Sequence, residues 1–263
     1  MSVLLDRRDD GVAVLTFDDP QRRNAMTAEM GEAIAERCAE LAVDDGLRVV
    51  VLTGAPPAFS AGGDLGMLES HARRTREEGF DATETMKRFY TTFLSVRDLP
   101  VPVVAAINGH AIGAGLCIAL ACDLRVVASE AKVGMNFSRL GLHPGMGGTW
   151  FLPRILGAQR AAEWLYAGDL YTGEEAARQG LAVDAVPGEQ VLARSLALAE
   201  RIATASPVVV RQLKSELADV ERVDLATALQ REAEGQHVSF SSRDLVVGLA
   251  AVRERREPEF EGR

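Results

Sequence analysis

Two glycine-rich turns carry the residue types and spacing that could do chemistry. The first is Ala58–Leu65, read Ala-Phe-Ser-Ala-Gly-Gly-Asp-Leu, and the second is Ile107–Cys117, read Ile-Asn-Gly-His-Ala-Ile-Gly-Ala-Gly-Leu-Cys. Backbone N–H groups at turns that open helices lack partners and attract negative charge. Two such groups aimed at one oxygen would form an oxyanion hole, which stabilises the negative oxygen that develops from a carbonyl. The alternative is that the glycines only permit tight turns and close helix packing.

Other catalytic and binding motifs are absent from the sequence. There is no Walker motif and no Gly-x-Ser-x-Gly elbow, and Ile118 stands where a dinucleotide-binding fingerprint requires glycine. We expect no metal, because no metal-ligand spacing joins the histidines and cysteines: His71, His110, His143, His237, Cys38, Cys117 and Cys122. The odd number of cysteines also argues against a disulfide framework and favours a reducing compartment.

The two turns must be positioned by the strands and helices around them. Short β-branched runs predict buried strands at residues 11–17, 49–52, 101–107 and 124–128. Helices are predicted over residues 28–43 with Thr27 as N-cap, over the charged segment 69–88, from the second turn through Ala121, and over 222–238 and 242–253. This alternation indicates an α/β core, because strands that alternate with helices form parallel sheets.

The chain becomes mainly helical after Trp150, which suggests a division near its last quarter. Ser206-Pro207 reads as an N-cap followed by proline in the first helical turn. We therefore predict a core over residues 1–203 and a C-terminal helical segment over residues 204–263.

The composition of the chain narrows the range of functions that it can have. The 263 residues are 47% hydrophobic and 25% charged, which is typical of a globular protein, and the net charge is −9. An acidic chain is a poor candidate for nucleic-acid binding, so we expect no nucleic-acid partner. The apolar stretch Val101–Cys122 is long enough to span a membrane, but Pro102, Asn108 and His110 interrupt it. No membrane span is expected, and residues 1–10 lack the apolar core of a signal peptide, which favours a cytoplasmic location.

Five segments, in order along the chain, resemble the signatures of the crotonase (enoyl-CoA hydratase/isomerase) superfamily. They are Pro20–Ala25, Ala58–Leu65, Asn108–Asp123, Phe137–Trp150 with its Gly-Leu-His-Pro-Gly-Met-Gly-Gly core, and Arg256–Phe260. The resemblance implies a crotonase-like α/β fold, in which a spiral of ββα turns is followed by a C-terminal helical trimerisation segment. It also implies a homotrimer or a hexamer of two trimers, and an acyl-CoA thioester as ligand. CoA would be part of the substrate, with no separate cofactor.

The resemblance assigns roles to residues at the two turns. The oxyanion-hole donors fall on the backbone N–H groups of Gly63 and Ala114. Contacts to CoA fall on Arg22, Arg23, Ala25, Ala61, Gly62 and Asp64, with the arginines suited to phosphates and Asp64 fixing the loop and the helix start.

The acidic residues that the family uses are missing from this chain. The two glutamates of the hydratases fall on Cys117 and Phe137, and the aspartate of some isomerases falls on Gly145. We therefore expect poor hydration of crotonyl-CoA, because general acid–base catalysis contributes about 10²–10⁴ in rate. His143 is the best candidate for a replacement acid or base, since no other side chain in residues 140–150 titrates.

Other residues could replace the missing acids, and a non-catalytic function is the alternative to an enzyme. A thiol at a helix start has a lowered pKa, which is the case for Cys117 as a nucleophile, although a small buried residue is the favoured interpretation. Glu69 and His71 could reach the pocket from the segment after the first turn, or lie on a solvated helix face. The chain is thus either an acyl-CoA enzyme with an atypical acid–base group or a non-catalytic acyl-CoA-binding regulator.

Overall fold

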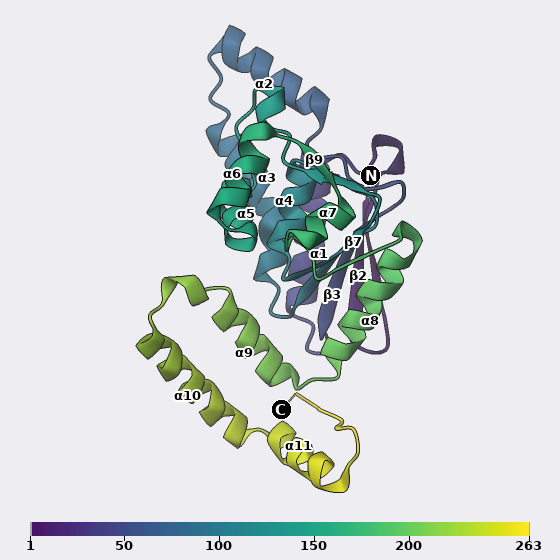
Figure 1. Ribbon diagram of the computed structural model, residues 1–263, viewed down its shortest axis with the longest axis vertical. Coiled ribbons are helices and arrows are strands. Elements are labelled where there is room, and N and C mark those ends of the chain that lie inside the picture. The colour runs from purple at the N-terminus through teal and green to yellow at the C-terminus, as the bar shows by residue number, and fades with distance from the viewer. Residues whose placement is uncertain (1, 263) are drawn as a thin grey trace.

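Residues 2–262 of the protein are described by a computed structural model, in which one large sheet forms the centre of the core (Figure 1). Its strand order is β1-β2-β3-β5-β7-β10; β1 runs antiparallel to β2 and the other pairs are parallel. The strands are β1 (Ser2–Arg7), β2 (Val12–Asp18), β3 (Val49–Gly54), β5 (Val103–Ile107), β7 (Leu124–Ala128) and β10 (Asp184–Val186). Parallel strands are covered on both faces, which explains why the sequence shows them as continuous apolar runs.

Alternate residues of the large sheet enter two separate cores. Val50 and Leu52 of β3 pack in the larger core, and Val49 and Val51 pack in the smaller one. The larger core contains residues of α1 (Ala28–Ala42), α3 (Thr83–Leu94) and α4 (Ala114–Ala121), and the smaller core contains residues of α8 (Val191–Ala203). The period-two alternation of strand side chains therefore assigns each helix to one face of the sheet.

A second, smaller sheet lies beside the large one, and its strands β4 (Ala58–Ser60), β6 (His110–Ile112) and β8 (Lys132–Gly134) follow the same order as β3, β5 and β7. The order of this sheet is β4-β6-β8-β9, in which β9 is Leu170–Thr172. Strands β3, β5 and β7 of the large sheet are each followed directly by β4, β6 and β8, and α2 (Leu65–Glu78) and α4 then follow the first two pairs. This repetition of long strand, short strand and helix is the predicted ββα spiral.

The remaining short elements connect these layers. They are α5 (Gly148–Leu156), α6 (Ala158–Ala167), α7 (Gly173–Arg178) and the short 3-10 turns Pro20–Arg22, Ser95–Asp98, Ser138–Leu140, Gly188–Gln190 and Val220–Arg222. All eight residues of α4 are buried, so this helix has no polar face and lies in the centre of the larger core.

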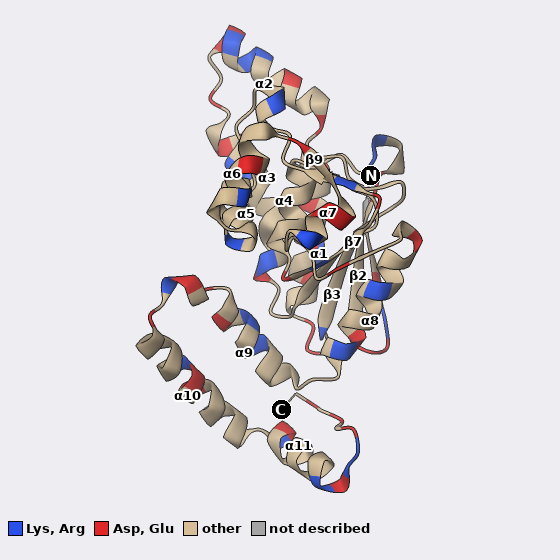
Figure 2. Ribbon diagram, viewed as in Figure 1, with Lys and Arg blue, Asp and Glu red and all other residues tan. Residues whose placement is uncertain are grey.

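The predicted charged helix over 69–88 is wrong, because the segment forms two helices. α2 ends at Glu78, and Gly79 follows it with φ +66° as a left-handed C-cap. α3 begins at Thr83 and turns Phe89 and Phe93 into the core. Figure 2 shows basic and acidic residues interspersed along α2, whose side chains include none that is buried.

The C-terminal helices form an arm that extends away from the core (Figure 1). The arm consists of α9 (Pro207–Leu217), α10 (Leu225–Ser241) and α11 (Arg243–Glu254), as the helical patterns predicted to within a few residues. Buried Asp244 ties the arm together, since its carboxylate accepts hydrogen bonds from the Ser206 hydroxyl and from the backbone N–H groups of Glu261 and Gly262. Whether residues 204–263 form a separate domain stays a prediction.

Across residues 2–262, no helix combines the length and the apolar character that a bilayer crossing demands. Within the same range, no group of three or more His, Cys, Asp or Glu side chains lies close enough to hold a metal ion.

Candidate functional site

The two glycine-rich turns meet in the structure. β4 and β6 are neighbouring parallel strands, with Ser60 paired to Ala111, so the turns that follow them leave the same edge of the small sheet. A β-carbon placed on Gly62 would lie 2.6 Å from the carbonyl oxygen of Ile112 and 3.7 Å from the backbone nitrogen of Ala114. The absence of a side chain at Gly62 therefore permits the contact between the two turns.

The backbone N–H of Gly63 is directed away from its neighbouring segment. Met26 forms a parallel bridge with Gly63: the Met26 N–H donates to the Gly62 carbonyl at 2.8 Å, and the Asp64 N–H donates to the Met26 carbonyl at 3.1 Å. In this parallel pattern the central residue turns its own N–H to the opposite side. Within residues 2–262 the Gly63 N–H has no hydrogen-bond partner.

The backbone N–H of Ala114 is also free. Ala114 is the first residue of α4, and the Gly113 carbonyl before it accepts from Leu116 and Cys117 at 3.1 and 3.0 Å. The first N–H groups of a helix have no intrahelical acceptor, and they form the positive end of its dipole. The Ala114 N–H finds no other acceptor in the described part of the chain. Two turns in contact thus each present one unpaired donor.

Asn24 clamps the first turn to the segment before α1. Its buried side chain donates to the carbonyls of Ala55 and Ala58 at 2.8 and 2.7 Å and accepts from the Asp19 N–H at 2.9 Å. The Ser60 hydroxyl donates to the Asn24 carbonyl at 2.8 Å. These bonds fix the position of the first turn relative to residues 20–25.

The predicted CoA-contacting residues lie around this clamp. The Ala61 N–H donates to the Arg23 carbonyl at 2.9 Å, and Asp64 caps α2 by accepting from the Met67 N–H at 2.8 Å. The exposed Arg22 forms an ion pair with Asp19 at 2.7 Å. The exposed Arg23 forms no ion pair with any residue in 2–262, so its guanidinium is available to an anion. The structure therefore brings the predicted residues Arg22, Arg23, Ala25, Ala61, Gly62 and Asp64 to one place.

The three positions to which the resemblance assigns the family's acids, Cys117, Phe137 and Gly145, are grouped, and none carries a carboxylate. The Cys117 thiol donates to the Gly145 carbonyl at 3.4 Å, and a β-carbon placed on Gly113 would lie 3.5 Å from the Phe137 ring. Burial raises the pKa of Cys117 to about 12. The expectation that the helix start lowers this pKa is wrong, because loss of solvent around the fully buried thiol outweighs the dipole. Cys117 is the small buried residue of the favoured interpretation.

A tyrosine that sequence reasoning missed lies beside these positions. A β-carbon placed on Gly145 would lie 2.6 Å from the hydroxyl oxygen of Tyr90, which comes from α3. The ring is half-buried, and burial raises the pKa of its phenol. In the sequence, Tyr90 reads only as part of an amphipathic helix face with Phe89 and Phe93, so no signal marked it.

The other acid–base candidates, His143, Glu69 and His71, are exposed or half-buried. His143 is exposed, and its Nδ1 lies 2.8 Å from the carbonyl oxygen of Pro144. Glu69 is exposed on α2. His71 is half-buried beside Phe80, with 5.9 Å between the ring centroids, and its Nδ1 has no hydrogen-bond partner. Within residues 2–262, no hydrogen bond joins these three residues to the backbone of Gly63 or Ala114, and their roles stay predictions.

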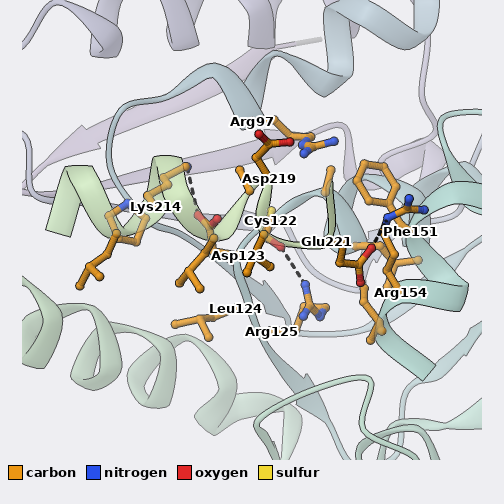
Figure 3. Close-up of a pocket in the computed structure, with 18 of the residues that line it drawn as sticks. Arg97, Cys122, Asp123, Leu124, Arg125, Phe151, Arg154, Lys214, Asp219 and Glu221 are labelled. Atoms are coloured by element: carbon orange, nitrogen blue, oxygen red, sulfur yellow. Dashed lines mark hydrogen bonds and ion pairs between the residues drawn. The ribbon is translucent and has the colours of Figure 1, made fainter. Parts of the chain in front are cut away.

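A cavity of about 450 Å³ lies elsewhere, between the core and the arm (Figure 3). Its lining includes Trp150 and two ion pairs, Lys214 with Asp123 at 3.0 Å and Arg154 with Glu221 at 2.8 Å. Neither glycine-rich turn contributes to it. These paired charges join α9 and the turn after it to the core, so the cavity marks a junction and not the candidate site.

Comparison with known proteins identifies relatives over the whole chain. Residues 7–263 match the family described as enoyl-CoA hydratase/isomerase. The 1,2-epoxyphenylacetyl-CoA isomerase of Escherichia coli is 34% identical, with all of both chains covered. The human mitochondrial enoyl-CoA hydratase domain-containing protein 2 is 34% identical over 97% of this chain and 87% of its own. The crystal structure of an enoyl-CoA hydratase from Bacillus anthracis superposes with a TM-score of 0.90 at 32% identity, covering all of both chains.

Proposed function

Because this chain belongs to the enoyl-CoA hydratase/isomerase family, we propose that it binds an acyl-CoA thioester with the thioester oxygen between the N–H groups of Gly63 and Ala114. The observation that carries the proposal is that two touching turns each present one backbone donor without a partner. A rigid pair of donors stabilises the enolate oxygen that forms when the α-carbon of a thioester loses a proton or its neighbour gains a nucleophile. In other enzymes, loss of one such donor costs about 3–4 kcal/mol of transition-state stabilisation.

The CoA portion would lie along the clamp between residues 20–25 and the first turn. The free guanidinium of Arg23 suits a phosphate, and Arg22 adds positive charge beside it. Ala25, Ala61 and Gly62 would contact CoA through small side chains or backbone, and Asp64 would hold the start of α2. CoA enters as part of the substrate, and the proposal includes no further cofactor.

We expect this protein to hydrate enoyl-CoA substrates slowly. Cys117, Phe137 and Gly145 supply no carboxylate to activate water or to move the α-proton. A general acid–base pair contributes about 10²–10⁴ in rate, so crotonyl-CoA hydration should lag far behind that of enzymes with both carboxylates. Hydration at the rate of such an enzyme would contradict this part of the proposal.

A non-catalytic acyl-CoA-binding role is the second candidate, and the missing carboxylates favour it. A binder would keep both N–H donors to recognise the thioester oxygen. Exchange of the α-protons of 3-hydroxybutanoyl-CoA in deuterium oxide distinguishes the two functions, because exchange requires the enolate and binding does not. Tight binding without exchange, and without product from any enoyl-CoA, would select the binder.

The central experiment removes one donor. Ala114→Pro deletes the N–H at the first helical position, where proline is tolerated. Ala158→Pro is a matched control, because Ala158 is also the first residue of a helix, follows the positive-φ Gly157 and is exposed. We expect Ala114→Pro to lose acyl-CoA exchange and weaken binding, while Ala158→Pro keeps both. Wild-type exchange and binding in Ala114→Pro would overturn the assignment of the oxyanion hole.

A further inference from the structure

Tyr90 occupies the space into which any side chain at position 145 would project. A β-carbon placed on Gly145 would lie 2.6 Å from the Tyr90 hydroxyl oxygen and 2.8 Å from Cζ. Both distances are shorter than real β-carbon contacts, so a side chain at position 145 would require the end of the Tyr90 ring to move. The phenol of this chain therefore stands where the related isomerases resemble one another in an aspartate.

The hydroxyl of Tyr90 has no hydrogen-bond partner within residues 2–262. The hydroxyl belongs to a half-buried side chain and stays within reach of solvent or of a bound molecule. Gly145 beside it has no side chain, and its carbonyl accepts from the Cys117 thiol at 3.4 Å. The half-buried O–H is thus free to donate to a bound molecule.

The position of Tyr90 connects it to the oxyanion hole. Cys117 lies one helical turn after Ala114 on α4, and its thiol reaches Gly145, which the Tyr90 hydroxyl overlies. A β-carbon placed on Gly148 would lie 3.3 Å from the same thiol. The Ala114 donor, Cys117, Gly145 and the Tyr90 hydroxyl therefore form one continuous group from α4 to α3.

We propose that Tyr90 is the catalytic proton donor of this site, in place of the missing carboxylates. The inference rests on the proposed function, since it requires a thioester enolate bound at Gly63 and Ala114. Tyrosine is among the side chains that serve as general acids. Burial keeps the phenol protonated at neutral pH, and the one titratable group that acts on it, the Cys117 thiol, is itself protonated there.

The proposed reaction needs water as its only co-reactant. Water forms a bond to the β-carbon of an enoyl thioester, and the C=C electron pair moves into the thioester to give the enolate. The Tyr90 O–H bond then breaks, and its proton and the enolate electron pair form the new Cα–H bond. The phenolate recovers a proton from the added water, which becomes the β-hydroxyl. In reverse, the β-hydroxyl of a 3-hydroxyacyl thioester takes the Tyr90 proton, and the phenolate so formed removes an α-proton as water leaves. The same residue would therefore carry α-proton exchange in a 3-hydroxyacyl-CoA.

The test compares Tyr90→Phe with Tyr166→Phe. Phenylalanine keeps the ring packing and removes only the hydroxyl, and Tyr166 is a matched control because it is 82% exposed on α6. We measure butanoyl-CoA binding by calorimetry, and deuterium exchange at the α-carbon of 3-hydroxybutanoyl-CoA by mass spectrometry. We expect Tyr90→Phe to bind like the wild type and to lose exchange by about 10²-fold or more, with Tyr166→Phe unchanged.

The outcomes separate this inference from the proposed function. Exchange that survives in Tyr90→Phe but is lost in Ala114→Pro would overturn Tyr90 and leave the oxyanion hole standing. Exchange that is lost in His143→Ala and kept in Tyr90→Phe would overturn Tyr90 in favour of His143. Binding without exchange in the wild type would overturn the enzyme and its proton donor together, and would support the non-catalytic role.

Discussion

The carbonyl oxygen of Ile112 lies 2.6 Å from the point where a β-carbon on Gly62 would stand. This contact predicts the effect of Gly62→Ala. The new methyl would push the second turn away from the first, and Gly62 has φ +96°, where side chains are strained. The separation of the Gly63 and Ala114 donors should cost about 10²–10³ in kcat/KM with acyl-CoA.

Gly79→Ala is the control for the backbone strain alone. Gly79 has φ +66°, and nothing lies within 4 Å of its would-be β-carbon. Both variants should lose about 1–2 kcal/mol of stability through the left-handed conformation, but only Gly62→Ala should lose activity. Equal kcat/KM in the two variants would show that the contact between the turns does not set the donor geometry.

A second prediction concerns the Asn24 clamp. Asn24→Gly permits the φ of 54° but removes the donors to the Ala55 and Ala58 carbonyls and the acceptor of the Asp19 N–H. A buried group left unpaired costs about 1–3 kcal/mol, so the free energy of unfolding should fall by about 2–4 kcal/mol. Denaturant unfolding measures it, and Asn24→Ala should fall further because alanine also strains this φ. Unchanged stability in Asn24→Gly would contradict the role of the clamp.

The main strands were predictable because their physical cause is local. β2, β3, β5 and β7 are β-branched and buried on both faces, and such runs are visible in the sequence. The three-residue strands of the small sheet were not predicted, since each is shorter than any readable pattern and depends on its neighbours for hydrogen bonds. The break at Gly79 was missed because charged residues continue on both sides of it.

In the candidate site, too, some residues could be identified from the sequence and others could not. The resemblance assigned the donors to Gly63 and Ala114, because the family's motifs are short local runs of sequence that can be matched residue by residue. Tyr90 was not identified in this way, because it meets Gly145 only through the packing of α3 on the loop before α5, a contact between residues far apart in the sequence. The pKa of Cys117 also depends on burial, which the sequence position at a helix start does not reveal.

The cysteines provide a third prediction, on reactivity. Burial raises the pKa of Cys38 to about 11 and those of Cys117 and Cys122 to about 12. The thiolate is the reactive form, so at neutral pH less than about 10⁻⁴ of each thiol can react. Iodoacetamide should therefore label none of them in the folded protein and all three in guanidinium, as mass spectrometry would show.

Labelling should also rise with pH, because a raised pKa leaves the thiol protonated until more alkaline conditions. A cysteine placed at the exposed Tyr166 is the positive control and should react in the folded protein. Rapid native labelling of Cys117 would restore the case for a nucleophilic thiol at this site.

The arm leads to a prediction about assembly. Apolar side chains on its helices are exposed in the single chain, among them Leu225, Phe240, Val246 and Val252, each more than two-thirds exposed. A group of exposed apolar residues of this kind marks a protein–protein interface, and burial of each contributes about 1.5–3 kcal/mol. The resemblance implies a trimer or a hexamer, so we expect light scattering to give a mass three or six times the 28.3 kDa of one chain. Phe240→Glu should dissociate this assembly, because it would bury an unpaired charge in the interface. Val43→Glu is the control and should leave the mass unchanged, because Val43 lies outside the arm and is 82% exposed. A wild-type mass of a single chain, or a Phe240→Glu assembly of wild-type size, would refute the arm as the interface.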